Sequence, residues 1–461
     1  MVSEDDCAFS RGRIPAHEVR GVLDTSLTLL LAKAQAGQHR ARLLSYGCDL
    51  STQQSTIHFT SRCYSEMISN HFMSYNKFSR PYIFYDQPRI DDPTTQFTSA
   101  VYYQMTGFWP QQLEEICHEM VLLPDIIRCQ STGCRATKHF ALFLLLRRWH
   151  TSGTWESVSY DLRQQRSWCI QMYHATFQLV AASYKKCVGV LDYRRINPLL
   201  SLWGQQMSQH CGCDDDVIFF TDGKPWRMSR PGKGRAVREI CAASGAEDVN
   251  LMQQAFYNGH YKYHGAKVQH VLQADGMAYS FTCPIRSHDA SVLRTSAMFL
   301  MLSNVYIDGD HNRPAKTVTD KAYGRTPHFQ PLHTETELRL LGAADRIIAA
   351  DFDKRHKKPR LAVENSFNQQ TTKFRFTDSF RNHKITQSGT SNWNYLRSMW
   401  DLQTLFFNLF TCSAGSQVTG VLGVCPPTVQ EYLYSCNNNL LIDLPDDGNE
   451  VNFDIVNDFY I

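Results

Sequence analysis

Apolar positions recur at helical spacing through residues 109–212. The spacing predicts helices over 111–121, 136–149 and 155–162, and a fourth helix from 167 onward. In the fourth helix, Ile170, Tyr173, Phe177 and Val180 share one stripe, which is the pattern of a helix packed on a core. A helical domain is therefore expected in this part of the chain.

Thr154 and Glu156 mark the start of the third helix. A threonine side chain caps free backbone N–H groups, and a negative charge suits the positive end of the helix dipole. A polar turn at 163–166 leads to Ser167, which is expected to cap the longer helix. Short helix, tight turn and longer helix are typical of a helix-turn-helix, whose second helix lies in the DNA major groove. Helical hairpins that bind nothing have the same pattern, so the pattern alone leaves DNA binding open.

After Cys213 the pattern changes to short apolar strands separated by turns and helices. Strands are expected over 217–220, 267–273, 277–284 and 316–319, and helices over 291–301, 334–345, from there through Glu364, and 393–410 on the outside. Ala274–Asp275–Gly276 is a good turn for an antiparallel hairpin. This order predicts an α/β domain with one mixed central sheet flanked by helices.

The chain is long enough for two or three domains, since 461 residues exceed the usual size of one. The first 108 residues show weak periodicity and are rich in Ser, Thr, Gln, Tyr and Pro after residue 57, which favours an irregular extension. The expected parts are the extension 1–108, a helix-turn-helix-like domain 109–212, the α/β domain 213–390, and a C-terminal helix with an acidic tail 391–461.

The fifteen cysteines do not follow zinc-site spacing. Structural zinc sites usually use two pairs spaced by two to four residues, and Cys129 with Cys134 is the one pair that fits. Most cysteines are therefore expected to be reduced thiols that pack as small hydrophobic residues. The longest apolar run, 140–146, is far shorter than the roughly 20 residues of a membrane span. The first residues lack a secretory signal pattern, so an intracellular protein is expected.

Charge is nearly balanced overall but unevenly distributed. Residues 224–238 contain six Lys or Arg and no acid, residues 354–360 (KRHKKPR) form a second basic block, and charged residues from 443 onward are all acidic. Such clusters suit a protein that handles nucleic acid, although a solvated charged face is more common. The block at 354–360 fits a nuclear import signal, a phosphate-binding patch or a solvated loop.

Three acidic residues are placed for metal chemistry. Asp222 and Asp320 each end an apolar strand, and Glu364 lies on a later helix. If the two strands are neighbours, their carboxylates lie side by side and repel each other unless a cation lies between them. Mg²⁺ or Mn²⁺ prefer such ligands, and two metals about 4 Å apart can activate water or a DNA 3′-hydroxyl. The alternative is that both aspartates are turn residues and Glu364 is a surface residue.

Other residues have simpler interpretations. His260 and His264 are four apart, but the intervening residues lack the Glu of a His-Glu-x-x-His zinc helix, so packing or DNA contact is favoured. Tyr257, Trp226 and Phe256 are of the type that stacks on bases, but aromatic residues at these spacings are more often core.

Four ordered segments resemble the core of the Harbinger transposases. Residues 255–276 (AFYNGHYKYHGAKVQHVLQADG) are similar to its aromatic-Asn-Gly-His segment, His-Gly-x-Lys strand and Asp-Gly turn. Residues 287–289 (SHD) resemble its His-Asp before a helix, 318–324 (VTDKAYG) its Asp-x-x-Tyr segment, and 363–367 (VENSF) the helix with the last acid. The helical hairpin lies where this family has its helix-turn-helix, so the resemblance covers about 111–376.

The resemblance implies a ribonuclease H-like fold that cuts and joins DNA with two Mg²⁺ or Mn²⁺ ions. It assigns the catalytic and metal-binding roles to Asp222, Asp320 and Glu364. By analogy with the family, it implies as partners DNA, a Myb-like accessory protein and a second copy of the chain, with a nuclear location and no membrane.

Further candidates, either to support the metal ligands or to contact DNA, are His288, Asp289, Lys267 and Lys373. Asp289 precedes a helix, so we expect it mainly to cap that helix or to support the metal ligands. Two features depart from the family pattern: Gly223 is followed by Lys rather than Thr or Ser, and 368–371 (NQQT) replaces Gly-Arg/Lys-x-Lys.

These departures leave alternatives beside an active transposase. One is a domesticated, catalytically silent DNA-binding or scaffold protein, and another is a nuclease without strand transfer.

Overall fold

The computed structural model describes residues 97–231, 253–286, 289–379 and 393–441, with 381, 383–384, 386–387 and 390–391 between the last two ranges. All of them belong to one compact unit that spans residues 66–461. Most of the predicted N-terminal extension, residues 232–238 of the first basic cluster, His288 and the acidic tail from 443 lie outside the described residues.

The first part of this unit is helical, as predicted. It contains α3 (Ser99–Thr106), α4 (Pro110–Glu119), α5 (Lys138–His150), α6 (Trp155–Leu162) and α7 (Arg166–Tyr184). The pattern did not predict α3, which lies in the expected extension, or the short antiparallel pair β1 (Ile126–Arg128) and β2 (Arg135–Thr137) before α5. From Phe140 to Trp149 every side chain of α5 is buried, so this helix is the centre of the helical part.

The predicted helical hairpin of α6 and α7 is present, with one correction at its turn. Thr154 caps α6 by accepting a hydrogen bond from the Ser157 N–H at 3.3 Å, as predicted. However, α7 begins at Arg166 with Gln165 at its N-cap, so the predicted cap at Ser167 is wrong. Arg163, the C-cap of α6, is in the left-handed region, and α7 begins three residues later at Arg166.

One face of α7 packs into the interior. Tyr173, Phe177 and Val180 of the predicted stripe are buried, while Ile170 is half-buried. The Tyr173 hydroxyl accepts a hydrogen bond from Trp149 Nε1 at 3.0 Å and lies 2.9 Å from the Tyr395 hydroxyl. The hairpin is therefore fixed to α5 on one side and to the later helix α17 (Trp393–Ala414) on the other.

Short helices connect the hairpin to the sheet. They are α8 (Lys186–Gly189), α9 (Tyr193–Ile196), the 3-10 turn η4 (Asn197–Leu199) and α10 (Leu200–Cys211). The predicted boundary at residue 212 falls in the Gly212 left-handed C-cap that ends α10. A single hydrophobic core nevertheless runs from Tyr102 to Leu441, so the helices and the sheet share it.

The central sheet is mixed, as predicted. Its strands are β3 (Val217–Arg227), β4 (Tyr257–Asn258), β5 (Tyr263–Gln273), β6 (Ala278–Pro284), β7 (Lys316–Thr319) and β8 (Phe329–Pro331). β6, β5 and β3 are antiparallel neighbours, β3, β7 and β8 are parallel neighbours, and β4 pairs with the start of β5. β3 is thus the central strand at which the two kinds of pairing meet.

β3 is longer than its apolar pattern indicated. The strand was expected to end at Phe220, but it continues through Asp222 to Arg227. The reason is its antiparallel partner: β5 pairs with β3 from Gln273 to Gly265, beyond the point where β7 stops. The backbone of β3 therefore keeps its hydrogen-bond partners although its side chains become polar.

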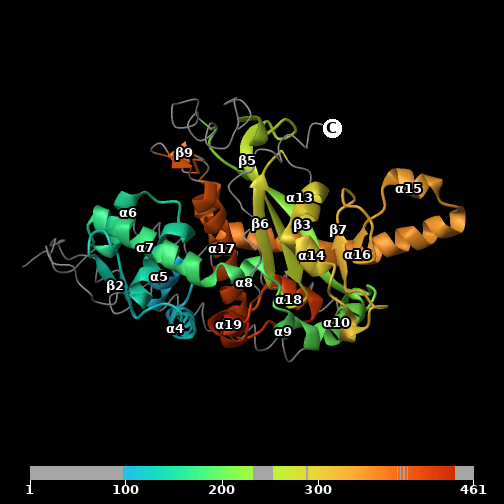
Figure 1. Cartoon of the computed structure of the whole chain (residues 1–461), viewed down its shortest axis with the longest axis horizontal. Coiled ribbons are helices and arrows are strands. Elements are labelled where there is room, and N and C mark those ends of the chain that lie inside the picture. The colour runs from blue at the N-terminus through green and yellow to red at the C-terminus, as the bar shows by residue number, and fades with distance from the viewer. Residues whose placement is uncertain are drawn as a thin grey trace, which may run out of the picture. The chain divides into compact units, whose positions relative to one another are not determined.

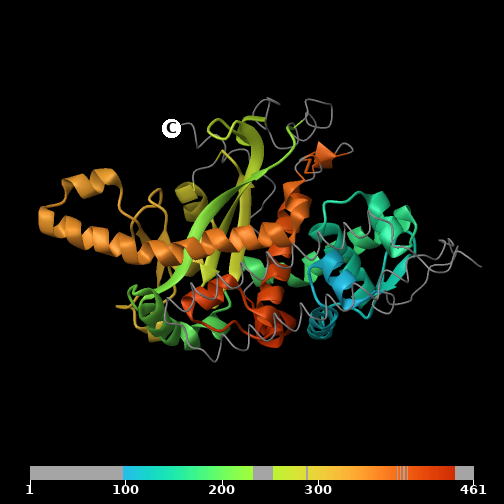
Figure 2. The same cartoon turned by 180° about the vertical axis from the view of Figure 1, so that it is seen from behind.

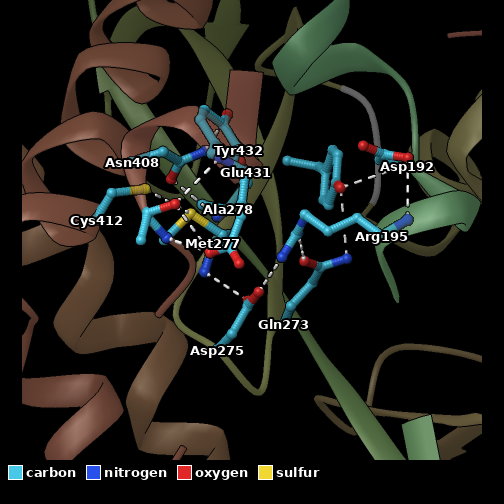
Figure 3. A network of polar contacts seen from close by, with 12 residues as sticks. Asp192, Arg195, Gln273, Asp275, Met277, Ala278, Asn408, Cys412, Glu431 and Tyr432 are labelled. Atoms are coloured by element: carbon cyan, nitrogen blue, oxygen red, sulfur yellow. Dashed lines mark hydrogen bonds and ion pairs between the residues drawn. The ribbon is translucent and has the colours of Figure 1, made fainter. Parts of the chain in front are cut away.

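The turn of the β5–β6 hairpin is as predicted and is fixed by buried polar contacts. Gly276 has φ 82°, the left-handed conformation that favours glycine, and Asp275 accepts a hydrogen bond from the Met277 N–H at 3.1 Å. Asp275 is also ion-paired with Arg195, and both side chains are buried. Figure 3 shows Arg195 between Asp192 on one side and Gln273 and Asp275 on the other.

Asn408 of α17 completes this network from the other side of the hairpin. Its side chain both accepts from the Ala278 N–H at 3.0 Å and donates to the Ala278 carbonyl at 2.8 Å (Figure 3). It also donates to the Tyr432 hydroxyl at 2.8 Å. Asn408 thus bonds both backbone polar groups of Ala278, as the backbone of a neighbouring strand would, and so joins α17 to β6.

Helices cover both faces of the sheet. α13 (Asp289–Thr295) and α14 (Ala297–Leu302) lie on the face nearer the viewer in Figure 1, and α16 (Ala343–Lys373) crosses the opposite face in Figure 2. The single helix predicted over 291–301 is divided, because Ser296 leaves the helical conformation and caps α14. The remaining elements are η5 (Ile307–Gly309), α15 (Glu335–Leu340), η6 (Arg375–Asp378), β9 (Thr386–Gln387), β10 (Thr390–Ser391), α17 (Trp393–Ala414), α18 (Gln417–Leu422) and α19 (Val429–Asn437).

α17 corrects one prediction. It was expected to be an amphipathic helix on the outside, but it packs against β6, α7, α8 and α19. Even its polar residues Asp401, Gln403 and Thr404 are buried. None of the helices in the described part of the chain combines the length and apolar character of a membrane span.

Candidate functional site

Asp222 and Asp320 are brought together by the parallel pairing of β3 and β7. Thr221 of β3 is the register partner of Thr319, the last residue of β7. Asp222 and Asp320 are the next residues on the two strands, and paired positions of parallel strands point to the same face. The two carboxylates predicted from sequence therefore lie beside each other, half-buried, at the end of β7.

The helix α16, which packs against β3, supplies the third acid (Figure 2). Glu364 lies on α16 with 40% of its side chain exposed. One turn earlier, Arg360 has Nη2 at 2.7 Å from Glu364 Oε1 and Nη1 at 3.5 Å from Asp222 Oδ2. The guanidinium group thus bridges the carboxylate of the strand and that of the helix.

The electrostatics of Asp222 depend on all three acids. Burial raises the pKa of Asp222 to about 6, and the carboxylates of Asp320 and Glu364 add to this increase. The Gly223 N–H, which donates to Asp222 Oδ1 at 2.8 Å, and the Arg360 guanidinium act in the opposite direction. The carboxylates of Asp320 and Glu364 are therefore close enough to Asp222 to oppose the ionisation of its carboxyl group.

Asp289 lies on the face of β3 opposite to the Asp222 side chain. It is the first residue of α13, and its Oδ1 is 2.9 Å from Lys267 Nζ. A Cβ atom added at Gly223 would be 2.5 Å from Asp289 Oδ1, so the carboxylate approaches β3 where a side chain is absent. Lys267 and Asp289 thus form an ion pair beside Gly223, on the face of β3 opposite to the Asp222 side chain.

Tyr323 lies near both this pair and the acids. Gln269 Nε2 donates to the Tyr323 hydroxyl and, at 2.9 Å, to the carbonyl of Asp289. Burial raises the pKa of Tyr323 well above its ordinary value, and Asp289, Asp222 and Asp320 raise it further. The tyrosine therefore keeps its proton close to the carboxylates. It belongs to the Asp-x-x-Tyr segment, which was recognised from sequence without a role for the tyrosine.

Lys373 lies away from this site. Its Nζ donates to the Gly107 carbonyl and is 3.2 Å from the ring centroid of Phe410. The side chain is buried, and burial lowers its pKa well below the ordinary value. An ammonium group in the interior does not reach a DNA surface, so the position of Lys373 contradicts the predicted DNA contact.

The remaining candidates divide between core and surface. Phe256 is core and packs edge-on against Trp393, and Trp226 is also buried. Tyr257 is 42% exposed, and its ring is 5.1 Å from that of His264. His260 is exposed in the loop before β5, so the two histidines do not lie on one helix.

The basic block 354–360 belongs to α16, which contradicts the solvated-loop interpretation. Arg355 pairs with Asp214 and Asp351, each at 3.0 Å. The last residue of the block is Arg360, whose role among the acids was missed. The signal was present, since Arg360 and Glu364 are four apart, the spacing at which helical side chains meet.

The donor set suits a divalent metal ion, but its arrangement holds Arg360 instead. Three carboxylates on two strands and a helix are the hard oxygen ligands that Mg²⁺ and Mn²⁺ prefer. Within the described ranges, no three Asp, Glu, His or Cys side chains are grouped closely enough to hold an ion. The positive charge between Asp222 and Glu364 is the guanidinium. A bound metal would therefore have to displace it.

Comparison with known proteins adds no further assignment, because no protein-family model, curated protein or solved structure matches this chain.

Proposed function

We propose that the chain is a metal-dependent DNA endonuclease of the DDE type, which cuts and joins DNA as a Harbinger-like transposase. The observation that carries this proposal is the register of β3 and β7. It sets Asp222 beside Asp320, with Glu364 on the helix that packs against β3.

The strand order supports a ribonuclease H-like domain. Three antiparallel strands (β6, β5, β3) continue into two parallel ones (β7, β8), and the acids lie where the central and fourth strands end their pairing. Ligands of open α/β sheets bind at the carboxyl ends of strands, which is where Asp320 follows β7.

Asp222 and Asp320 would share the metal ions, and Glu364 would complete their ligands from α16. When bound, the metals supply an activated water or 3′-hydroxyl and stabilise the leaving oxygen. Asp289 and Lys267 would hold the first strand in place, and Tyr323, which keeps its proton, would donate a hydrogen bond to a neighbouring oxygen. Arg360, released from its carboxylates, would remain as a positive charge for a DNA phosphate.

The proposal is tested with the full-length protein on supercoiled plasmid DNA with Mn²⁺. Asp320→Asn removes the charge and keeps the shape, and it should reduce nicking by roughly a hundredfold or more, the scale of losing transition-state charge stabilisation. Asp310→Asn, an exposed aspartate on a neighbouring loop, is the matched control and should cleave like the wild type. Equal nicking by the wild type and Asp320→Asn overturns the assignment. Joined products distinguish a transposase from a nuclease without strand transfer.

A second candidate is a domesticated, catalytically silent DNA-binding or scaffold protein. The ion pairs of Arg360 favour it, because they neutralise two acids without a metal. This candidate predicts that the wild type binds DNA, takes up no Mn²⁺ and cleaves nothing. DNA, a Myb-like accessory protein, a second copy of the chain and a nuclear location belong to both candidates.

A further inference from the structure

A strip of side chains along β3 connects the acidic site to a cavity. Alternate residues of a strand share one face, so Asp222, Lys224 and Trp226 point to the same side. That side is covered by α16, which packs against β3. A carboxylate, an ammonium group and an indole therefore follow one another along the strand.

Side chains of α16 lie opposite these residues of β3. Glu364, Asn368 and Thr371 are spaced by four and three residues and so lie on one face of α16. Asn368 Oδ1 accepts a hydrogen bond from Lys224 Nζ at 3.4 Å. Strand and helix thus run side by side from the acids, past Lys224, to Trp226 and Thr371.

At one end of this strip is a cavity of about 390 Å³. Thr371 is among its lining residues; we call the buried Trp226 and Trp400 its floor and the more exposed Lys224, Arg227 and Tyr263 its rim. Pockets for small organic groups begin at roughly 300 Å³. The cavity is therefore large enough for a nucleoside but not for a double helix.

The floor is apolar and rigid. The ring centroids of Trp226 and Trp400 are 5.3 Å apart. Trp226 Nε1 donates to the Thr377 carbonyl at 3.0 Å, and Trp400 Nε1 donates to His270 Nε2 at 3.3 Å. Because both indole N–H groups are used inside the protein, the rings offer the cavity only carbon surfaces.

The rim combines an aromatic ring with positive charge. Tyr263 is half-buried, and the Arg227 guanidinium carbon is 5.7 Å from its ring centroid. Lys224 lies between the cavity and the acids. Asp378 also lines the cavity, and its carboxylate can accept hydrogen bonds from the amino group of a base. Bases stack on aromatic side chains, and Lys and Arg pair with the phosphates beside them.

The spacing suits DNA. From Asp222 to Trp226 is four residues, or roughly 13 Å along an extended strand. Stacked nucleotides are separated by about 3.4 Å along one strand. A phosphate at the acids would therefore place a base roughly three or four nucleotides away at the cavity.

We propose that this cavity binds an unpaired base of the DNA strand whose phosphate lies at the acids. The base would enter between Tyr263 and the tryptophan floor, and its flanking phosphates would pair with Lys224 and Arg227. The inference rests on the proposed function, since it assumes that DNA passes from the acids to the cavity. It adds that the protein holds a nucleotide outside the duplex, as enzymes do when a base must leave the stack.

The test measures binding without any metal. Fluorescence anisotropy of a labelled twelve-nucleotide oligodeoxycytidine is titrated with full-length protein in EDTA, beside a duplex of the same length. Tyr263→Ala should weaken single-strand binding about tenfold, the scale of losing one base–aromatic stack, whereas Tyr263→Phe should remain within about twofold. Lys224→Ala should reduce the salt slope by about 0.7. Arg194→Ala, which removes an exposed cation on α9, controls for charge and should change neither value.

Tight, Tyr263-dependent binding of the single strand confirms the inference. It is overturned if the single strand does not bind, or if Tyr263→Ala and Lys224→Ala bind it as tightly as the wild type. Thermal unfolding of each variant shows whether it has folded, and Tyr263→Phe separates loss of the ring from loss of the hydroxyl. Because EDTA removes the metals, this result is independent of cleavage. If the protein binds the single strand through Tyr263 but does not cleave DNA, the inference about the cavity stands and the proposed nuclease activity is rejected.

Discussion

Arg360 Nη2 lies 2.7 Å from Glu364 Oε1, one turn away on α16, and the same guanidinium reaches Asp222 on β3. Like charges at such a site are unfavourable without a counter-charge, and here the chain provides its own. In the proposed metal-bound state, Arg360 would have to leave these carboxylates. In the protein alone, its guanidinium explains how Asp222 and Glu364 can lie close together.

Replacing Arg360 should therefore have opposite effects with and without metal. Arg360→Gln leaves Asp222 and Glu364 without their partner and should lower stability by about 1 kcal/mol, between exposed and buried pairs. For a unit that spans residues 66–461, that loss corresponds to a decrease of about 1 °C in Tm. Mn²⁺ should then raise the Tm of Arg360→Gln more than that of the wild type, because no guanidinium competes for the carboxylates.

Thermal unfolding with and without Mn²⁺ measures both effects. Lys354→Gln, an exposed residue on the same helix, should behave like the wild type in both conditions. If Mn²⁺ stabilises the wild type as much as Arg360→Gln, the guanidinium does not compete with the metal.

Lys373 should make no contribution to DNA binding. Its ammonium group is buried against Phe410 and donates to Gly107, so it cannot displace counterions from a phosphate. Lys373→Met should leave both DNA affinity and its salt dependence unchanged within about twofold. Anisotropy titrations at several salt concentrations test this, and a salt slope that decreases by about one would place Lys373 on DNA after all.

The ion pair of Arg195 and Asp275 should be important for stability. Both side chains are buried, and removing one partner leaves the other charge uncompensated. Arg195→Ala should therefore lower the free energy of unfolding by about 3–5 kcal/mol. Arg194→Ala removes the exposed neighbouring arginine and should change it by less than about 0.5 kcal/mol. Urea unfolding of both variants provides the comparison, and equal losses would reject a special role for the buried pair.

Asp401 should make stability depend on pH. Burial raises its pKa from 3.8 to about 6, so the folded state binds this proton more tightly than the unfolded state. The contribution of Asp401 to the free energy of unfolding is fully present below pH 3.8 and is lost as the pH rises through about 6. The free energy of unfolding of Asp401→Asn, relative to that of the wild type, should therefore increase between pH 4 and pH 7.5 by at most about 3 kcal/mol. Urea unfolding at these two pH values measures it, with Asp310→Asn as the exposed control, and a difference that does not change with pH contradicts the prediction.

Local patterns predicted the elements of the site well. The apolar strand at 316–319 matches β7 residue for residue, and the turn at Asp275–Gly276 is as expected, because both depend on neighbouring residues. The sequence could place Asp222 beside Asp320 only on the assumption that their strands are neighbours. The register of Thr221 with Thr319 shows that the strands are neighbours and that the two positions are level with each other.

Features that depend on distant partners were missed. β3 extends to Arg227 because β5 pairs with it, and β5 follows much later in the sequence. α17 has polar residues that look like a solvated face, but Asn408 is buried because it pairs with the β6 backbone. In the sequence, Lys373 resembles a surface cation, but in the structure it is buried against the ring of Phe410. Tertiary contacts, rather than local composition, determine each of these.

The central claim is that Asp222, Asp320 and Glu364 bind divalent metal, and a calorimetric titration with Mn²⁺ tests it most directly. The full-length wild type and Asp310→Asn should show saturable binding, and Asp320→Asn should lose affinity by at least about tenfold, as expected for a lost metal contact. Absence of saturable binding by the wild type, or equal affinity in Asp320→Asn, would contradict the claim.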